Sequence, residues 1–143
     1  CQIGDHVIMS NNASLAGHVT IHDWAILGGF TLVKQFCMIG IHTYIGMGCH
    51  VNKDIPAYMV ASGTQTRVRS INAEGMRRRG FSSSSIASIK RAFKAVYRES
   101  TGRLLDQMLK ELEVSEADSL EVMQFVNCIR GSKVGIMRGP VEE

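Results

Sequence analysis

Histidine and cysteine are among the residue types of this 143-residue chain that can move protons, attack carbonyl carbons or bind metal ions. All five histidines lie within residues 1–56. His18 and His22 are four positions apart, but the repeat described below puts them on different faces, so they cannot bind one metal ion together. The four cysteines show no CxxC or zinc-site spacing, which favours reduced thiols, no bound metal and a cytosolic compartment.

Three consecutive arginines occupy residues 77–79. Glu74 and Arg78 have the i,i+4 spacing of a helical surface ion pair, which contributes about 0.3–0.5 kcal/mol. Because a planar guanidinium suits phosphate, the run could bind a phosphate group, dock an acidic partner or simply form a solvated face. The net charge of +3 is too small to indicate nucleic-acid binding, and we expect none.

A six-residue repeat positions these residues. Every sixth residue of the first part is aliphatic: Ile3, Met9, Leu15, Ile21, Leu27, Val33, Ile39, Ile45 and Val51. Gly often follows this position, where we expect it to supply the backbone angles of a corner. The register predicts a parallel β-helix whose triangular coils take about 18 residues each. The coils would cover residues 3–20, 21–38 and 39–56. A β-sandwich, whose strands alternate with period two, fits less well.

The pattern changes after Pro56. The β-helix would occupy residues 1–56, followed by an extended connection over 57–68, a helical domain over 69–132 and a tail over 133–143. Spacing and capping residues predict helices over 71–79, 86–97, 104–112 and 119–129. The first 56 residues carry five charges and the remainder carries 24. This asymmetry is expected if a prism with a buried interior precedes helices that face solvent.

Targeting signals are not evident. No apolar run approaches the length of about 20 residues that a membrane helix needs, and no basic and apolar zones resemble a signal peptide. The chain begins with Cys rather than Met, so it could be a fragment.

Four stretches carry a resemblance to a known family: Asn11–Val19, Gln35–Cys37 with Ile39–Gly40, Asp54–Tyr58 and Asn72–Phe81. Their order and spacing resemble those of the acyl-carrier-protein-dependent UDP-N-acetylglucosamine O-acyltransferases, which catalyse the first step of lipid A synthesis in Gram-negative bacteria. The resemblance implies a left-handed β-helix followed by a C-terminal α-helical domain, in a cytoplasmic homotrimer with active sites between adjacent prisms. It also implies a reaction, without a cofactor, between UDP-N-acetylglucosamine and a 3-hydroxyacyl-acyl carrier protein.

The resemblance implies roles for single residues. The main-chain N–H of Gly17 would stabilise the oxyanion of the thioester under attack, and His18 and Gln35 would contact substrate. The residues that would bind the uridine nucleotide are Asn72, Glu74 and Arg78. Met47 would bound the acyl pocket and, because its side chain fills the space of several methylenes, would favour a shorter acyl chain.

The family's general base is the His of a His-Asp-Cys triplet. Cys1 matches that Cys, so the base would lie two residues before this chain begins, and the chain alone is expected to be catalytically incomplete. Residues 18 positions apart stack, so the position two before Cys1, Gly17 and Gln35 form one column. Coils about 4.8 Å apart could place a base and an oxyanion donor around one carbonyl.

Two residues depart from the family pattern. Lys34 replaces a His, and Gln65 replaces the His of a Gly-Asn-His turn, so the sugar or acyl group could differ. Three alternatives remain open. A non-catalytic trimeric scaffold would explain the missing base, a related amino-sugar N-acyltransferase is disfavoured by Asn72–Phe81, and a metal-dependent enzyme of the carbonic anhydrase type would need convergent histidines.

Overall fold

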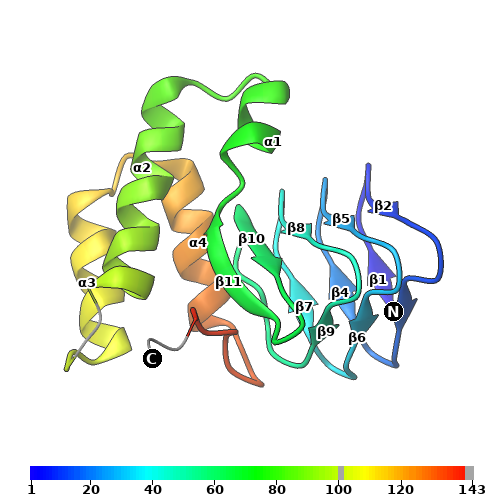
Figure 1. The fold of residues 1–143 in the computed structure, drawn as a ribbon. Coiled ribbons are helices and arrows are strands. Elements are labelled where there is room, and N and C mark those ends of the chain that lie inside the picture. Colours follow the sequence, from blue (N-terminus) through cyan, green and yellow to red (C-terminus); the bar gives the residue numbers. More distant parts are fainter. Residues whose placement is uncertain (100–101, 141–143) are drawn as a thin grey trace.

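The computed structural model describes residues 1–99 and 102–140 and has two parts. A triangular β-prism lies on the right of Figure 1, with the N-terminus at its far end, and a group of helices covers the opposite end. The hairpin β10–β11 lies between the two parts. Of the tail predicted over 133–143, residues 141–143 lie outside the described part.

The prism is a left-handed parallel β-helix of about three coils, as predicted. Its nine strands have two residues each: β1 Gln2–Ile3, β2 Ile8–Met9, β3 Ser14–Leu15, β4 Thr20–Ile21, β5 Ile26–Leu27, β6 Leu32–Val33, β7 Met38–Ile39, β8 Tyr44–Ile45 and β9 His50–Val51. Each of the first six strands pairs in parallel with the strand 18 residues later, so Ile3 pairs with Ile21 and Ile21 with Ile39. Three faces result, which we call face A (β1, β4, β7), face B (β2, β5, β8) and face C (β3, β6, β9).

The aliphatic residues of the repeat point into the prism. Those of the second coil, such as Ile21 and Leu27, are almost fully buried, because stacked coils exclude water from them. Ile3 and Met9 of the first coil remain 53% and 37% exposed, because no coil of this chain covers them. The same hexad position is therefore core in one coil and surface in another.

The corners of the prism have left-handed backbone angles at residues other than the glycines for which we expected them. The φ angle lies between 56° and 70° at every sixth residue: His6, Asn12, His18, Trp24, Phe30, Phe36 and His42. Such angles cost a side-chain-bearing residue about 1–2 kcal/mol, so the stacking of coils must hold them.

The repeat glycines serve a different purpose from the one we predicted. Gly4, Gly28, Gly40 and Gly46 have no positive φ, so the expectation that they supply corner angles was wrong. A Cβ added to Gly28 would lie 2.6 Å from the Met47 nitrogen, and one added to Gly40 would lie 2.4 Å from the Ala57 nitrogen. These positions need glycine because the next coil passes too close for any side chain.

A hairpin and four helices follow the prism. β10 Met59–Ser62 pairs in parallel with β8 and so extends face B, and β11 Arg67–Ile71 returns antiparallel to it. The segment predicted as an extended connection therefore continues a sheet of the prism. The helices are α1 Ala73–Arg78, α2 Ser83–Phe93, which runs on into the π-helical turn η1 Lys94–Arg98, α3 Leu105–Ser115 and α4 Leu120–Arg130. None of the described helices is long and apolar enough to cross a membrane.

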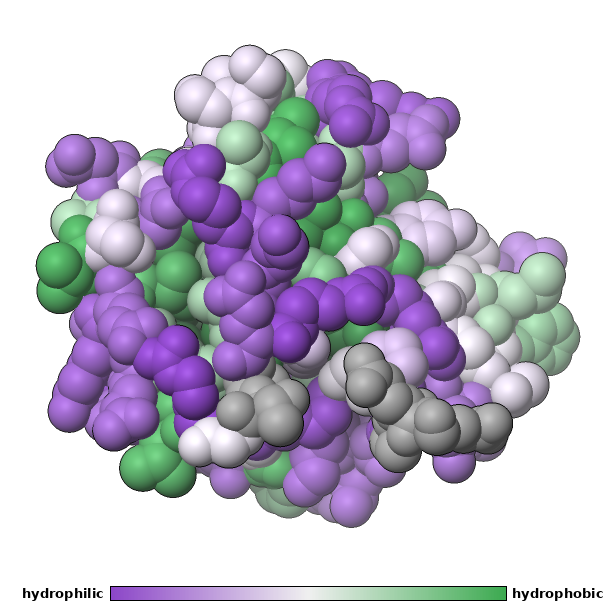
Figure 2. Space-filling model, turned by 60° about the vertical axis from the view of Figure 1, so that its left-hand side comes forward, coloured by the Kyte–Doolittle hydropathy of each residue, from purple (hydrophilic) through white to green (hydrophobic). Residues whose placement is uncertain are grey.

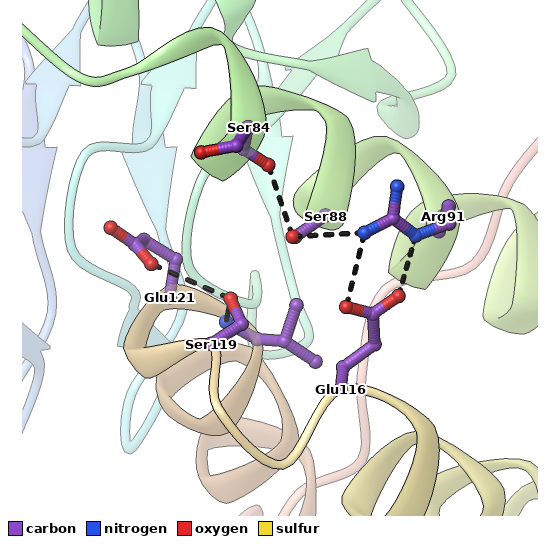
Figure 3. Close-up of polar contacts among 7 residues, drawn as sticks. Ser84, Ser88, Arg91, Glu116, Ser119 and Glu121 are labelled. Atoms are coloured by element: carbon purple, nitrogen blue, oxygen red, sulfur yellow. Dashed lines mark hydrogen bonds and ion pairs between the residues drawn. The ribbon is translucent and has the colours of Figure 1, made fainter.

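Polar contacts fasten α2 to the connection between α3 and α4 (Figure 3). The Arg91 guanidinium donates to both carboxylate oxygens of Glu116, at 2.5 and 3.2 Å, and to the Ser88 hydroxyl at 3.1 Å. These hydrogen bonds hold the pKa of the Glu116 carboxyl below its usual value. The Ser119 hydroxyl accepts from the Val122 N–H at 3.2 Å and caps α4.

The surface of the helical part is largely hydrophilic in the view of Figure 2, whereas paler and greener residues gather on the right of the view. This distribution agrees with the charge asymmetry of the sequence. The charged residues therefore mark the solvent-facing side of the helical part.

Candidate active site

The corner between faces C and A brings two predicted site residues together. We call it the open corner; it consists of residues 16–19 and 34–37. Gly17 and Gln35 lie one coil apart, and a Cβ on Gly17 would be 3.7 Å from Gln35 Nε2. The Gly17 carbonyl accepts from the Phe36 N–H at 3.1 Å, and the His18 ring stacks on the Phe36 ring at 5.0 Å.

The Gly17 N–H is available to a ligand. Gly17 is exposed, and its N–H donates to no acceptor among residues 1–99 and 102–140. A contact at 3.7 Å is ordinary van der Waals distance, so no close approach within the chain requires glycine here, in contrast to Gly40. A free, exposed N–H on a residue that has no side chain of its own is a suitable donor to an oxyanion.

A groove on face B holds the residues predicted to bind nucleotide. It has a volume of about 640 Å³ and lies between the sheet and α1, lined by Ile26, Tyr44, Val60, Ile71, Asn72, Ala73, Glu74, Gly75 and Arg77–Arg79. Glu74 and Arg78 form the predicted ion pair at 2.8 Å, but both side chains are exposed, so the pair adds little stability. Three arginines along one wall make the groove a suitable site for an anion.

Asn72 has a structural task in addition to its predicted one. Its Oδ1 accepts from the Gly75 N–H at 3.2 Å, which caps α1, and its Nδ2 donates to the His42 carbonyl at 2.9 Å. The side chain is buried in this arrangement. Its contact with a nucleotide stays a prediction, while its amide already joins α1 to the prism.

The corner between faces A and B contains functional candidates that sequence reasoning missed. We call it the closed corner; it consists of residues 4–7, 22–25 and 40–43. The rings of His6, Trp24, His42 and Tyr58 stack in a column, with successive centroids 4.1, 6.0 and 5.4 Å apart. Arg79 lies over the Trp24 ring at 5.3 Å, and its Nη1 is 3.0 Å from His42 Nδ1. The 18-residue spacing of three of these rings was the available signal.

Burial dominates the electrostatics of the closed corner. It lowers the pKa of His42 to about 4, with a further contribution from the Arg79 charge that the nearby Asp23 carboxylate partly opposes. Burial also lowers the pKa of Arg79, with a contribution from Arg78. His42 is therefore neutral at pH 7, and it can accept a hydrogen bond from a guanidinium.

The other residues singled out in the sequence lie at different places on the prism. Lys34 is exposed beside Gln35 at the open corner, and Gln65 is exposed in the β10–β11 turn. Met47 is 79% exposed at the third corner, between faces B and C, so it can meet a ligand or a second chain. Among residues 1–99 and 102–140, no group of three His, Cys, Asp or Glu side chains could hold a metal ion.

One chain does not bring the open corner and the groove together. The groove lies on face B, and the open corner is the edge of the triangle opposite that face. Residues expected to stabilise the transition state and residues expected to bind the nucleotide thus lie on opposite sides of the prism. They can share one substrate only if the groove of one chain meets the open corner of another.

The stacked two-residue strands and the six-residue repeat define a hexapeptide-repeat protein. The sequence model described as UDP N-acetylglucosamine O-acyltransferase, domain 2, matches residues 54–137, more than half of the chain. The chain therefore belongs to the UDP-N-acetylglucosamine O-acyltransferase family.

Individual relatives agree with this assignment. Over 136 residues the chain is 51% identical to the acyl-(acyl-carrier-protein)–UDP-N-acetylglucosamine O-acyltransferase of Ectopseudomonas mendocina, covering 95% of this chain and 52% of that protein. The structure of the UDP-N-acetylglucosamine acyltransferase of Bacteroides fragilis superposes with a TM-score of 0.90 at 36% identity, covering 95% of this chain and 52% of that one. The Campylobacter jejuni enzyme gives a TM-score of 0.89 at 31% identity, covering 98% and 54%. The chain spans about half the length of the curated relatives it matches.

Proposed function

We propose that the protein containing this chain transfers a 3-hydroxyacyl group from acyl carrier protein to the 3-hydroxyl of UDP-N-acetylglucosamine, the first step of lipid A synthesis. The observation that carries the proposal, beyond family membership, is the exposed and unengaged N–H of Gly17 in one column with Gln35. Such an N–H can donate to the oxyanion that forms when a thioester carbonyl is attacked.

The chemistry needs a base, an oxyanion donor and no cofactor, because the thioester is already activated. A histidine two positions before Cys1 would remove the proton of the sugar hydroxyl, and the resulting oxygen would attack the thioester carbonyl. The Gly17 N–H would donate to the oxyanion of the tetrahedral intermediate. When the intermediate collapses, the carbon–sulfur bond breaks and the departing thiolate takes the proton back from the base.

The active site would be shared between copies in a cytoplasmic homotrimer. The groove of one copy, with Asn72, Glu74 and Arg78, would hold the nucleotide while the open corner of its neighbour, with His18 and Gln35, contacts the sugar or phosphate. The positions of the groove and the open corner on opposite sides of one prism support a site shared between copies.

Two further features would adapt this site to its substrates. Exposed arginines such as Arg77 would help to dock the acidic acyl carrier protein. The exposed Met47 would bound the acyl pocket and favour a shorter acyl chain.

An acyl-transfer assay tests the proposal. The protein, with any residues that its gene encodes upstream of Cys1, is incubated with UDP-N-acetylglucosamine and 3-hydroxyacyl-acyl carrier proteins of several chain lengths. We expect formation of the 3-O-acylated sugar nucleotide. Absence of transfer with every chain length would overturn the proposal and favour a non-catalytic trimeric scaffold.

A further inference from the structure

We propose that His42 is a positioning residue that holds Arg79 at the rim of the groove for an anionic ligand. The inference rests on the proposed function only in naming that ligand as a nucleotide. The contact between the two side chains joins the prism to the end of α1, and neither the six-residue repeat nor the arginine run predicted it.

The chemistry of the contact fixes the state of the His42 ring. A guanidinium carries only donors, so the nitrogen that it faces must offer a lone pair. His42 Nδ1, 3.0 Å from Arg79 Nη1, is therefore the acceptor, and the ring is the neutral tautomer with its proton on Nε2. A protonated ring could not make this contact.

The His42 ring is held on several sides, so it can impose its position on Arg79. Trp24 and Tyr58 stack on its two sides, and the Phe81 ring meets it edge-on at 4.9 Å. The backbone of His42 is fixed as well, because its N–H donates to the Asp23 carbonyl at 3.0 Å and its carbonyl accepts from Asn72. The side chain is only 6% exposed.

Arg79 differs from its two neighbours in the groove. Arg77 and Arg78 are exposed, and Arg78 is paired with Glu74, whereas Arg79 is half-buried against Trp24 and His42. Within the described part of the chain, no carboxylate lies within ion-pair distance of Arg79. A guanidinium that is already ordered, and that has no anion of its own, loses little conformational entropy when it binds one.

The geometry therefore distinguishes Arg79, which is held in place, from the exposed Arg77 and Arg78. Arg79 supplies a fixed charge at the rim of the groove, and His42 sets where its remaining N–H groups point. Removing the His42 acceptor should free the guanidinium without removing its charge. Ligand binding should then weaken although every arginine is still present.

Titration calorimetry with UDP tests this inference on the protein that contains the chain. The His42→Phe variant keeps a stacking ring but loses the acceptor, and we expect it to bind UDP roughly tenfold more weakly. Arg79→Gln should weaken binding by a similar or larger factor, and the double variant should be no weaker than Arg79→Gln alone. His6→Phe, at the outer end of the same column and away from Arg79, is the matched control and should bind as the wild type does.

The outcomes separate this inference from the proposed function. If the wild type binds UDP and His42→Phe binds it equally well, the positioning role is wrong while the function stands. If the wild type does not bind UDP, the assignment of the groove to a nucleotide fails, and the contact is judged by nitrogen NMR of the His42 ring. A proton on Nδ1 at pH 7 would overturn the inference, whereas a lone pair there, with Arg79 losing order in His42→Phe, would support it.

Discussion

The open and closed corners are built from the same repeat position and carry different structures. Both turn at a residue with a left-handed backbone, His18 in one and His42 in the other, and both stack side chains at 18-residue intervals. At the closed corner, Phe81 and Arg79 pack against the column, whereas His18 and Phe36 at the open corner are exposed. The comparison shows that the same repeat position is buried and structural where other residues pack outside it, and is exposed to ligands where none do.

The sharpest test of this comparison replaces one glycine at each corner by alanine. At Gly40 of the closed corner a Cβ would lie 2.4 Å from the Ala57 nitrogen, so backbone atoms must move. We expect Gly40→Ala to lower the free energy of unfolding by about 3 kcal/mol or more, measured by thermal or urea unfolding. A variant as stable as the wild type would show that the closed corner is not tightly packed.

Gly17→Ala at the open corner should reduce activity but leave stability nearly unchanged. The nearest atom, Gln35 Nε2, is at ordinary contact distance, so the unfolding midpoint should change little. A methyl group beside the N–H would obstruct the developing oxyanion, and we expect kcat/KM for acyl transfer to fall roughly 100-fold. Normal kinetics in Gly17→Ala would contradict the expectation that the reacting carbonyl lies against Gly17.

Acid should weaken the closed corner through His42. Its pKa is lowered to about 4 in the folded protein, chiefly by burial, so unfolding at lower pH takes up a proton. The stabilisation from the neutral ring is present above the ordinary pKa of about 6.5 and is lost as pH falls toward 4.

This loss can be measured as the free energy of unfolding of the wild type and of His42→Phe at a series of pH values. The wild type should lose on the order of 1–2 kcal/mol more than His42→Phe between pH 7 and pH 4. Parallel pH profiles for the two proteins would contradict the assignment.

Met47 at the third corner should affect selectivity rather than stability. Because its side chain is 79% exposed, Met47→Gly should shift the unfolding midpoint only slightly. If this side chain bounds the acyl pocket, the variant should prefer longer acyl chains in a competition between acyl carrier proteins. Unchanged chain selectivity would remove Met47 from the acyl pocket.

The β-helix could be predicted from the sequence because an aliphatic residue at every sixth position determines which residues stack and which strands pair. The ion pair of Glu74 and Arg78 was predictable for the same reason, since it depends on local helical spacing. Arg79 and His42 were not, because they lie 37 positions apart and meet only where the end of α1 returns to the prism. The glycines were misread because close approach between coils and a left-handed turn both favour glycine.

The most direct test of the proposed shared active site mixes two impaired variants. Gly17→Ala impairs the open corner and Arg79→Ala impairs the groove, so a site between copies would be intact where each supplies its unaltered half. If copies assemble at random from an equal mixture, a quarter of the shared sites contain two unaltered halves, so about a quarter of the wild-type acyl-transfer activity should return. An activity no higher than that of the two variants alone would contradict the account, because the open corner and groove would then not serve one site.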